Sequence, residues 1–310
     1  MTQTAEIQKM QWCLTGLLTL VVLGLLPPAA AWADGAQEPF LSPPAQHVVE
    51  ARHAVRCLQV SAFGSSVNSA ARPTPVAFGR KQSSLPDLSG YQDVHARKLR
   101  FFGFLLPMVE AENRRLADIR RRLHFVYEHV RWEREIPADD RAWLETVVRD
   151  FRIEKSDFSA TDFWYDALLR VDGVPENLVL VQAANESAWG TSRFAREGNN
   201  LFGQWCFSPG CGIVPEHRPH GATYEVAEFS SVDESVSSYM RNLNTGHSYQ
   251  LLREIRARMR GEDLQPDPAE LAAGLTSYSE RGLAYVDEIR AMLRHNEEVI
   301  SEARSRAVSE

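Results

Sequence analysis

From about residue 96 onward, apolar residues recur at the three- and four-residue spacing that is typical of amphipathic helices. The first such stretch, FFGFLLPMVEAENRRLADIRRRLHFVYEHV, predicts a long helix that starts near Pro107. Two further helices are predicted, one after Pro137 and one after Ser159. We therefore expect a helical N-terminal subdomain over residues 96–160.

The next predicted helix is an apolar run that starts near Pro175. Pro175 and Glu176 are predicted to open it, because proline is favoured in the first turn of a helix. Gln182 and Glu186 are four residues apart, so they are expected to share one face. The apolar stripe beside that face consists of Leu178, Val181 and Ala184.

The helical pattern is interrupted once, at residues 198–212, by a stretch dense in glycine, asparagine and aromatic residues. Alternation over residues 223–229 predicts a short strand, with Ile213 and Val214 pairing against it as a β hairpin. Helices then resume, with start signals at Ser231 and Asp267. The predicted fold class is mainly α (α+β), with one small β hairpin.

The N-terminus has the layout of a secretory signal peptide. Lys9 precedes an apolar run that two prolines end, and small residues precede a cleavage site before Asp34. Residues 1–33 are therefore predicted to direct export, and residues 34–95 to be a weakly ordered, linker-like region. An uncleaved inner-membrane anchor is the alternative, although the apolar run is short for a membrane span. We expect a bacterial, periplasmic protein.

Composition excludes one broad class of partner. Apolar residues make up 44% of the 310 residues and charged residues 24%, which are ordinary values for a globular protein. The formal net charge of −7 argues against nucleic-acid binding.

Two of the four cysteines lie close together in the sequence. Cys206 and Cys211 flank a Pro-Gly turn, and export makes a local disulfide between them plausible. A metal site is the weaker interpretation, because His217 and His220 do not follow a standard zinc spacing. We expect no metal and no cofactor, and Cys57 is left without an assigned partner.

The segment QAANESAWG, residues 182–190, is the strongest candidate for chemistry. It places the carboxyl group of Glu186 at the end of an apolar helical run, just before a Trp and a Gly. An apolar wall raises the pKa of a carboxyl group and keeps it protonated near neutral pH, as a general acid requires.

Four blocks in this order resemble the glucosaminidase domain of glycoside hydrolase family 73, and in particular its Bax-type bacterial members. The blocks are QAANESAWG, SRFAREGNNLFGQWCF with GCGIVP, FSSVDESVSSYMRNLNT, and SYSERGLAYVDEIRAML. The resemblance implies a lysozyme-like domain over residues 161–310 that hydrolyses β-1,4 bonds after N-acetylglucosamine in peptidoglycan. It implies that Glu186 is the catalytic acid and that Tyr278 steadies a reaction intermediate.

The second catalytic group is left open by the sequence. Glu216 is the first choice for a second carboxylate, and Glu225 and Glu228 are alternatives on opposite faces of the predicted strand. A substrate-assisted route through the N-acetyl group of the sugar would need none of the three.

Substrate contacts are expected from side chains near the acid, namely Gln182, Asn200, Phe202 and Trp205. Two other functions remain open for the same residues. A lytic transglycosylase would use the single Glu on the same glycan strands, and a non-catalytic wall-binding protein would keep only the fold.

Overall fold

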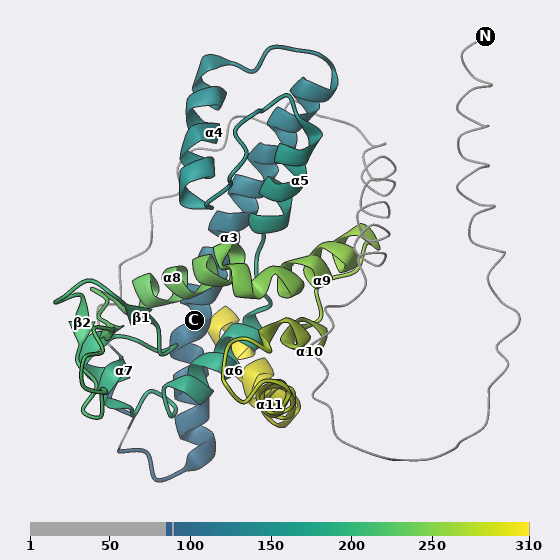
Figure 1. The fold of residues 1–310 in the computed structure, drawn as a ribbon. Helices are drawn as coiled ribbons and strands as arrows, with labels where there is room; N and C mark the ends of the chain where they lie inside the picture. The colour runs from purple at the N-terminus through teal and green to yellow at the C-terminus, as the bar shows by residue number, and fades with distance from the viewer. Residues whose placement is uncertain (1–84, 89, 310) are drawn as a thin grey trace, which may run out of the picture. The chain divides into compact units, whose positions relative to one another are not determined.

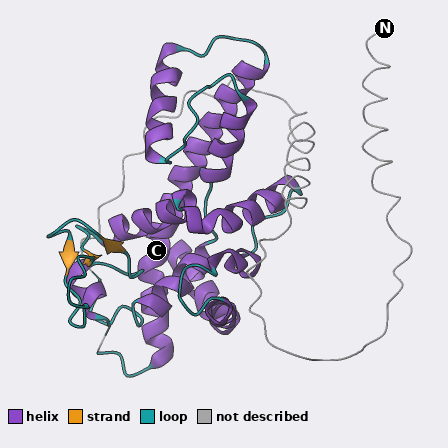
Figure 2. Cartoon of the chain, in the orientation of Figure 1, coloured by secondary structure: helices purple, strands orange, loops and turns teal. Residues whose placement is uncertain are grey.

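The computed structural model describes residues 85–88 and 90–309, all within one compact unit of the chain (Figure 1). The predicted signal peptide, most of the region over residues 34–95 and Cys57 lie outside the described residues. In the described part, helices dominate and a three-stranded antiparallel sheet lies at one side (Figure 2). The predicted mainly α fold class is confirmed.

The described helices have the following bounds. They are α3 (Val94–Arg131), α4 (Ala138–Asp150), α5 (Thr161–Arg170), α6 (Glu176–Glu186), α7 (Arg193–Gly198), α8 (Val232–Thr245), α9 (Gln250–Gly261), α10 (Pro268–Leu271) and α11 (Leu283–Ser309), with short 3-10 turns η1 (His247–Tyr249) and η2 (Ala272–Leu275). No helix of this described part is long and apolar enough to cross a membrane.

Helix α3 starts well before the residue that the sequence suggested. Asp93 caps it by accepting a hydrogen bond from the backbone N–H of His95 at 3.0 Å, and Pro107 lies inside the helix. The expected start near Pro107 was wrong because apolar residues on both sides of the proline are buried in the core. Their burial outweighs the single backbone hydrogen bond that a proline removes.

Helix α6 forms the centre of the core. It contacts α3 and α11, and seven of its residues, from Leu178 to Ala184, are buried. The single apolar stripe expected from the sequence is therefore too narrow, because neighbouring elements cover this helix on several faces. The region over residues 96–160 shares this core, since α3 packs against α6, α8 and α11.

Predicted start signals are seen at two later helices. The hydroxyl of Ser231 accepts from the backbone N–H of Glu234 at 3.2 Å at the start of α8. The carboxylate of Asp267 accepts from the backbone N–H of Glu270 at 2.8 Å at the start of α10. Both side chains satisfy N–H groups that a helix leaves unpaired at its first turn.

The small sheet contains one strand more than the expected hairpin. β1 (Trp205–Cys206) and β2 (Gly212–Ile213) both pair antiparallel with β3 (Glu225–Ala227), in the order β1-β3-β2. The predicted pairing of Ile213 with the later strand is confirmed, opposite Val226. Gly212 permits this close pairing, because a Cβ atom there would lie 2.0 Å from the carbonyl oxygen of Val226.

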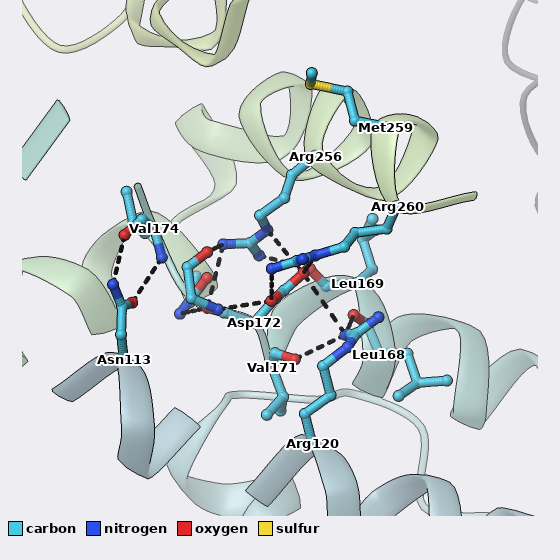
Figure 3. A network of polar contacts seen from close by, with 12 residues as sticks. Asn113, Arg120, Leu168, Leu169, Val171, Asp172, Val174, Arg256, Met259 and Arg260 are labelled. Carbon is cyan, nitrogen blue, oxygen red and sulfur yellow. Dashed lines mark hydrogen bonds and ion pairs between the residues drawn. The ribbon is translucent and has the colours of Figure 1, made fainter. Parts of the chain in front are cut away.

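A buried ionic cluster anchors the segment that leads into α6 (Figure 3). The carboxylate of Asp172 accepts two hydrogen bonds of 3.2 Å from Arg260, and it lies 3.7 Å from Arg256 and 4.0 Å from Arg120. Asp172 is 4% exposed and Arg256 only 1%. Arg256 also donates to the carbonyl oxygens of Leu169 and Gly173. The cluster ties α3, α9 and the α5–α6 connection together.

Asn113 of α3 holds the same segment from the other side (Figure 3). Its side-chain amide accepts from the backbone N–H of Val174 at 2.9 Å and donates to the carbonyl of Val174 at 2.8 Å. Such a two-way amide contact fixes both the position and the direction of the backbone. The start of α6 is thus clamped between α3 and α9.

Candidate active site

Glu186 is the last residue of α6, and a tight turn follows it. Ala188, Trp189 and Gly190 all have positive φ, at 51°, 60° and 76°. The hydroxyl of Ser187 donates to the carbonyl of Ala183 at 2.5 Å and accepts from the backbone N–H of Gly190 at 2.8 Å. This turn ends the helix directly after Glu186 and fixes the position of its carboxyl group.

Trp189 secures the turn against α3. Its ring lies 5.8 Å from that of Phe101 and 5.3 Å from that of Phe102, both in edge-on geometry, and the ammonium of Lys98 lies 4.9 Å from its centroid. Edge-on aromatic pairs add to the stabilisation from apolar burial. Trp189 therefore has a packing role at the end of the helix.

The carboxyl group of Glu186 is half-buried and hydrogen-bonded through one oxygen. Its Oε1 accepts from the hydroxyl of Tyr285 at 2.8 Å and from the side-chain amide of Asn185 at 3.3 Å. Burial raises the pKa of Glu186 above its ordinary value, and these two donors partly oppose that rise. The carboxyl group is thus biased toward the protonated form that an acid catalyst needs.

Gln182 lies beside Glu186 on the same face of α6, but it is fully buried. Its amide donates to the hydroxyl of Tyr285 at 2.9 Å, and its Oε1 accepts from the hydroxyl of Tyr239. The expected direct contact of Gln182 with substrate is therefore corrected to a contact with two tyrosines. The reason is that α8 and α11 supply these tyrosines and cover this part of α6.

Tyr278 belongs to the same group of aromatic side chains. Its ring stacks on that of Tyr285 with centroids 5.3 Å apart, and its hydroxyl donates to the carbonyl of Phe202 at 2.8 Å. Burial raises the pKa of Tyr278 well above its ordinary value, so its hydroxyl stays protonated and acts as a donor. Tyr278 connects the loop after α7 to the surroundings of Glu186.

Asn200 and Phe202 shape that loop from inside, which differs from their expected role as sugar contacts. Asn200 is 2% exposed and donates to the carbonyls of Gln204 and Ala227, at 2.9 and 2.8 Å. Phe202 is also 2% exposed and stacks on Tyr239 with centroids 3.9 Å apart. Tertiary packing covers both side chains, so neither offers an open surface to a sugar ring.

Trp205 is the one expected contact residue with a largely open side chain, at 56% exposure. It lies in β1 and stacks on Tyr224 with centroids 4.3 Å apart and an interplanar angle of 9°. The pair presents aromatic surface at the sheet, where a sugar ring could stack.

Two of the three candidate second carboxylates, Glu216 and Glu225, have polar partners in the structure. Glu216 is exposed and pairs with Arg193 at 3.2 Å. Glu225 accepts from the backbone N–H groups of Gly210 and Gly212, at 3.1 and 2.9 Å, and these bonds lower its pKa. Glu228 is exposed. Glu225 thus caps the loop between β1 and β2.

That loop is also closed covalently, by a disulfide between Cys206 and Cys211. Glu225 lies opposite Cys206 in the pairing of β1 with β3. The disulfide and the Glu225 cap act on the same turn, so together they hold the loop beside the sheet in one conformation.

The sequence did not point to Tyr285, which connects Gln182 to Glu186, or to Tyr239, which donates to Gln182. A signal for Tyr285 was present, because it lies seven residues after Tyr278 in the same block, SYSERGLAYVDEIRAML. Tyr239 carried no comparable signal, since an aromatic residue on an amphipathic helix is ordinarily a core residue.

A half-buried acid at the end of a core helix, held by a tyrosine hydroxyl, is an arrangement suited to the acid chemistry of glycoside hydrolases. Residues 164–298 match the glucosaminidase family, described as mannosyl-glycoprotein endo-beta-N-acetylglucosaminidase. The chain is also 34% identical over 221 residues to Protein bax of Escherichia coli (strain K12), which covers 71% of this chain and 77% of that relative. No solved structure matches the chain. The chain belongs to the glucosaminidase family.

Proposed function

We propose that this protein is a peptidoglycan hydrolase, an endo-β-N-acetylglucosaminidase in which Glu186 is the general acid. The observation that carries the proposal is the half-buried carboxyl of Glu186, with its raised pKa, at the end of α6 in a chain of the glucosaminidase family. The family name points to a glycan substrate with N-acetylglucosamine on one side of the cleaved bond.

In the proposed mechanism, neutral Glu186 donates its proton to the glycosidic oxygen as the bond to the anomeric carbon breaks. The sugar oxygen is a poor leaving group until it is protonated, so this donation lowers the barrier. The leaving oxygen receives the proton and the bonding electron pair, and positive charge develops on the anomeric carbon. Water then adds there and restores the proton to Glu186.

The stabilising group for that positive charge is proposed to be the N-acetyl group of the substrate. This substrate-assisted route is favoured because Glu216 is paired with Arg193 and Glu225 is committed to the loop backbone. Tyr278, stacked on Tyr285, is the proposed residue that steadies the intermediate. Glu216 stays the first alternative as a second carboxylate, and Trp205 is the proposed stacking platform for a sugar.

The test is digestion of purified peptidoglycan by the wild type, Glu186→Gln and Glu216→Gln, with products identified by mass spectrometry. We expect reducing N-acetylglucosamine ends from the wild type and a loss of about 10²–10⁴-fold in rate for Glu186→Gln. Glu216→Gln is expected to keep most activity, and a loss equal to that of Glu186→Gln would restore Glu216 as the second catalytic carboxylate.

The same experiment separates the competing functions. Acid catalysis by Glu186 alone would also suit a lytic transglycosylase, which would leave anhydro-muramic ends instead of reducing N-acetylglucosamine ends. If wild type and Glu186→Gln leave peptidoglycan equally intact while both bind it, the protein is a wall-binding protein and the proposed hydrolysis is wrong.

We further propose that the protein is exported to the periplasm, on the basis of the pattern in residues 1–33. Cell fractionation followed by N-terminal sequencing of the protein would test this. A mature N-terminus near Asp34 in the periplasmic fraction is expected. An intact N-terminus in the inner-membrane fraction would indicate an uncleaved tether, and a cytoplasmic protein would refute export.

A further inference from the structure

A continuous chain of three hydrogen bonds ends on the carboxyl group of Glu186. The hydroxyl of Tyr239 donates to Oε1 of Gln182, the Nε2 of Gln182 donates to the hydroxyl of Tyr285 at 2.9 Å, and that hydroxyl donates to Oε1 of Glu186 at 2.8 Å. The links come from three helices, α8, α6 and α11. Gln182 and Tyr239 are each 0% exposed.

The direction of this chain is set by the amide of Gln182. An amide side chain donates only through its nitrogen and accepts only through its oxygen, whereas a phenol hydroxyl has a single proton. Because Gln182 points its nitrogen at Tyr285, the oxygen of Tyr285 is an acceptor there and its one proton is directed at Glu186. Burial raises the pKa values of Tyr239 and Tyr285, so both hydroxyls keep their protons.

One oxygen of the Glu186 carboxyl is therefore already used as an acceptor. Oε1 receives the proton of Tyr285 and also the amide N–H of Asn185 at 3.3 Å. A carboxylic acid carries its proton on one oxygen, and a proton on Oε1 would face two donors. The proton of neutral Glu186 is consequently favoured on Oε2.

We propose that Gln182 is a positioning residue whose buried amide makes Tyr285 a donor and thereby directs the acid proton of Glu186 to Oε2. The use of that proton on a glycosidic oxygen rests on the proposed function above. If the amide were turned around, Tyr285 would donate to Gln182 and accept from Glu186. The acid proton would then lie on Oε1 and point into the protein.

Other charged and titratable groups lie near Glu186, but they are not part of the three hydrogen bonds that end on its carboxyl group. Arg281 lowers the pKa of Glu186 and Glu288 raises it, and these two side chains pair with each other at 2.5 Å. The charge of Glu186 also contributes to the raised pKa values of Tyr249 and Tyr278. The hydroxyl of Tyr278 donates a hydrogen bond to the backbone carbonyl of Phe202. Tyr249 thus offers a control, because it is a tyrosine near Glu186 outside the three hydrogen bonds.

The test is a direct titration of Glu186 in the purified full chain by carbon-13 NMR of glutamate side-chain carboxyl groups, with Glu186→Gln used to assign the signal. Tyr285→Phe removes the donor to the charged carboxylate, so we expect the titration midpoint to rise by about one pH unit. Tyr249→Phe should change the titration midpoint of Glu186 by no more than about a quarter of a pH unit relative to the wild type.

Gln182→Met tests the role of the amide, because methionine has a similar side-chain volume but no amide group. Without the amide, the hydroxyl of Tyr285 is free to turn and accept from protonated Glu186, so the midpoint should rise and kcat should fall at little change in KM. A midpoint unchanged in Tyr285→Phe, or lowered in it, would overturn the proposal. So would a Gln182→Met protein that titrates and reacts like the wild type.

The design separates this proposal from the proposed function and from simple misfolding. NMR titration needs no enzymatic activity. A wild type that cleaves no glycan would refute the proposed hydrolase function, but the titration would still show in which direction the three hydrogen bonds run. Tyr285→Phe keeps the ring that stacks on Tyr278 and should fold, which circular dichroism and a thermal melt would check. If Gln182→Met unfolds, the titration midpoint of Glu186 in Tyr285→Phe alone decides whether Tyr285 donates to Glu186 as proposed.

Discussion

Replacing Asp172 with asparagine should destabilise the fold more than any comparable change at the surface. The substitution keeps the size and shape of the side chain but removes the one carboxylate that lies among Arg120, Arg256 and Arg260 (Figure 3). The three guanidinium groups would then face one another without a counter-charge in a largely buried site. The segment that leads into α6 depends on this cluster.

The magnitude follows from the contact distances. Two unit charges 4 Å apart attract by about 4 kcal/mol at an effective dielectric constant near 20, and the three arginines lie 3.2 to 4.0 Å from Asp172. Desolvation of the carboxylate cancels much of this attraction, and breaking a buried pair typically costs about 3–5 kcal/mol. We expect a loss in that range, or roughly 6–20 °C in Tm for a chain of this size.

The loss should also depend on pH. The three arginines hold the pKa of Asp172 below its ordinary value despite burial. A carboxyl group with a lowered folded-state pKa stabilises above its unfolded pKa, near 4, and loses that contribution as pH falls through the folded value. The difference between wild type and Asp172→Asn should therefore be full at pH 7 and shrink below about pH 4.

The assay is urea unfolding and thermal melting of both proteins, with Asp118→Asn as the matched control. Asp118 pairs with Arg121 three residues along α3, where the side chain of Arg121 is 69% exposed and that of Asp118 35%. Exposed pairs of this kind contribute less than about 1 kcal/mol. A loss for Asp172→Asn no larger than that of Asp118→Asn, or one that is the same at pH 3 and pH 7, would refute the electrostatic reasoning.

Three further predictions concern the site and its loops. Because the pKa of Glu186 is raised, glycan cleavage should be lost as pH rises through that pKa, and a pH–rate profile without such a limb would contradict Glu186 as the acid. Gly190→Ala should cost about 1–3 kcal/mol in thermal melts, since φ is 76° and a Cβ atom would lie 2.4 Å from Leu85; an unchanged Tm would count against this turn. Cys206→Ser with Cys211→Ser should cost about 2 kcal/mol by urea unfolding, because the closed loop is short, and a much larger loss would show that the disulfide holds more than this loop.

Local signals were reliable wherever a side chain acts on nearby backbone. Ser231 and Asp267 cap helices where the pattern predicted starts. Such features depend on a few neighbouring residues, so the sequence contains all that is needed to predict them. Pro107 was misleading because its local cost is small beside the apolar burial that continues α3 through it.

Burial of the expected sugar contacts could not be predicted in this way. Gln182, Asn200 and Phe202 all stand in segments that suggested contact with a sugar, yet each is covered by other parts of the chain. The covering residues come from far along the sequence, such as Tyr285, about a hundred positions after Gln182. Spacing within a helix predicts a shared face, but it does not predict what lies on that face.

The amino-acid sequence was enough to predict the helical fold class, the end of α6 at Glu186, and the blocks that place the chain in the glucosaminidase family. These depend on residues close together or on motifs in a fixed order. The groups that surround Glu186, and the oxygen of its carboxyl that is already bonded, follow from how the helices pack together. A hydrogen bond requires a specific distance and direction, and for residues far apart in the chain only the packed helices supply both.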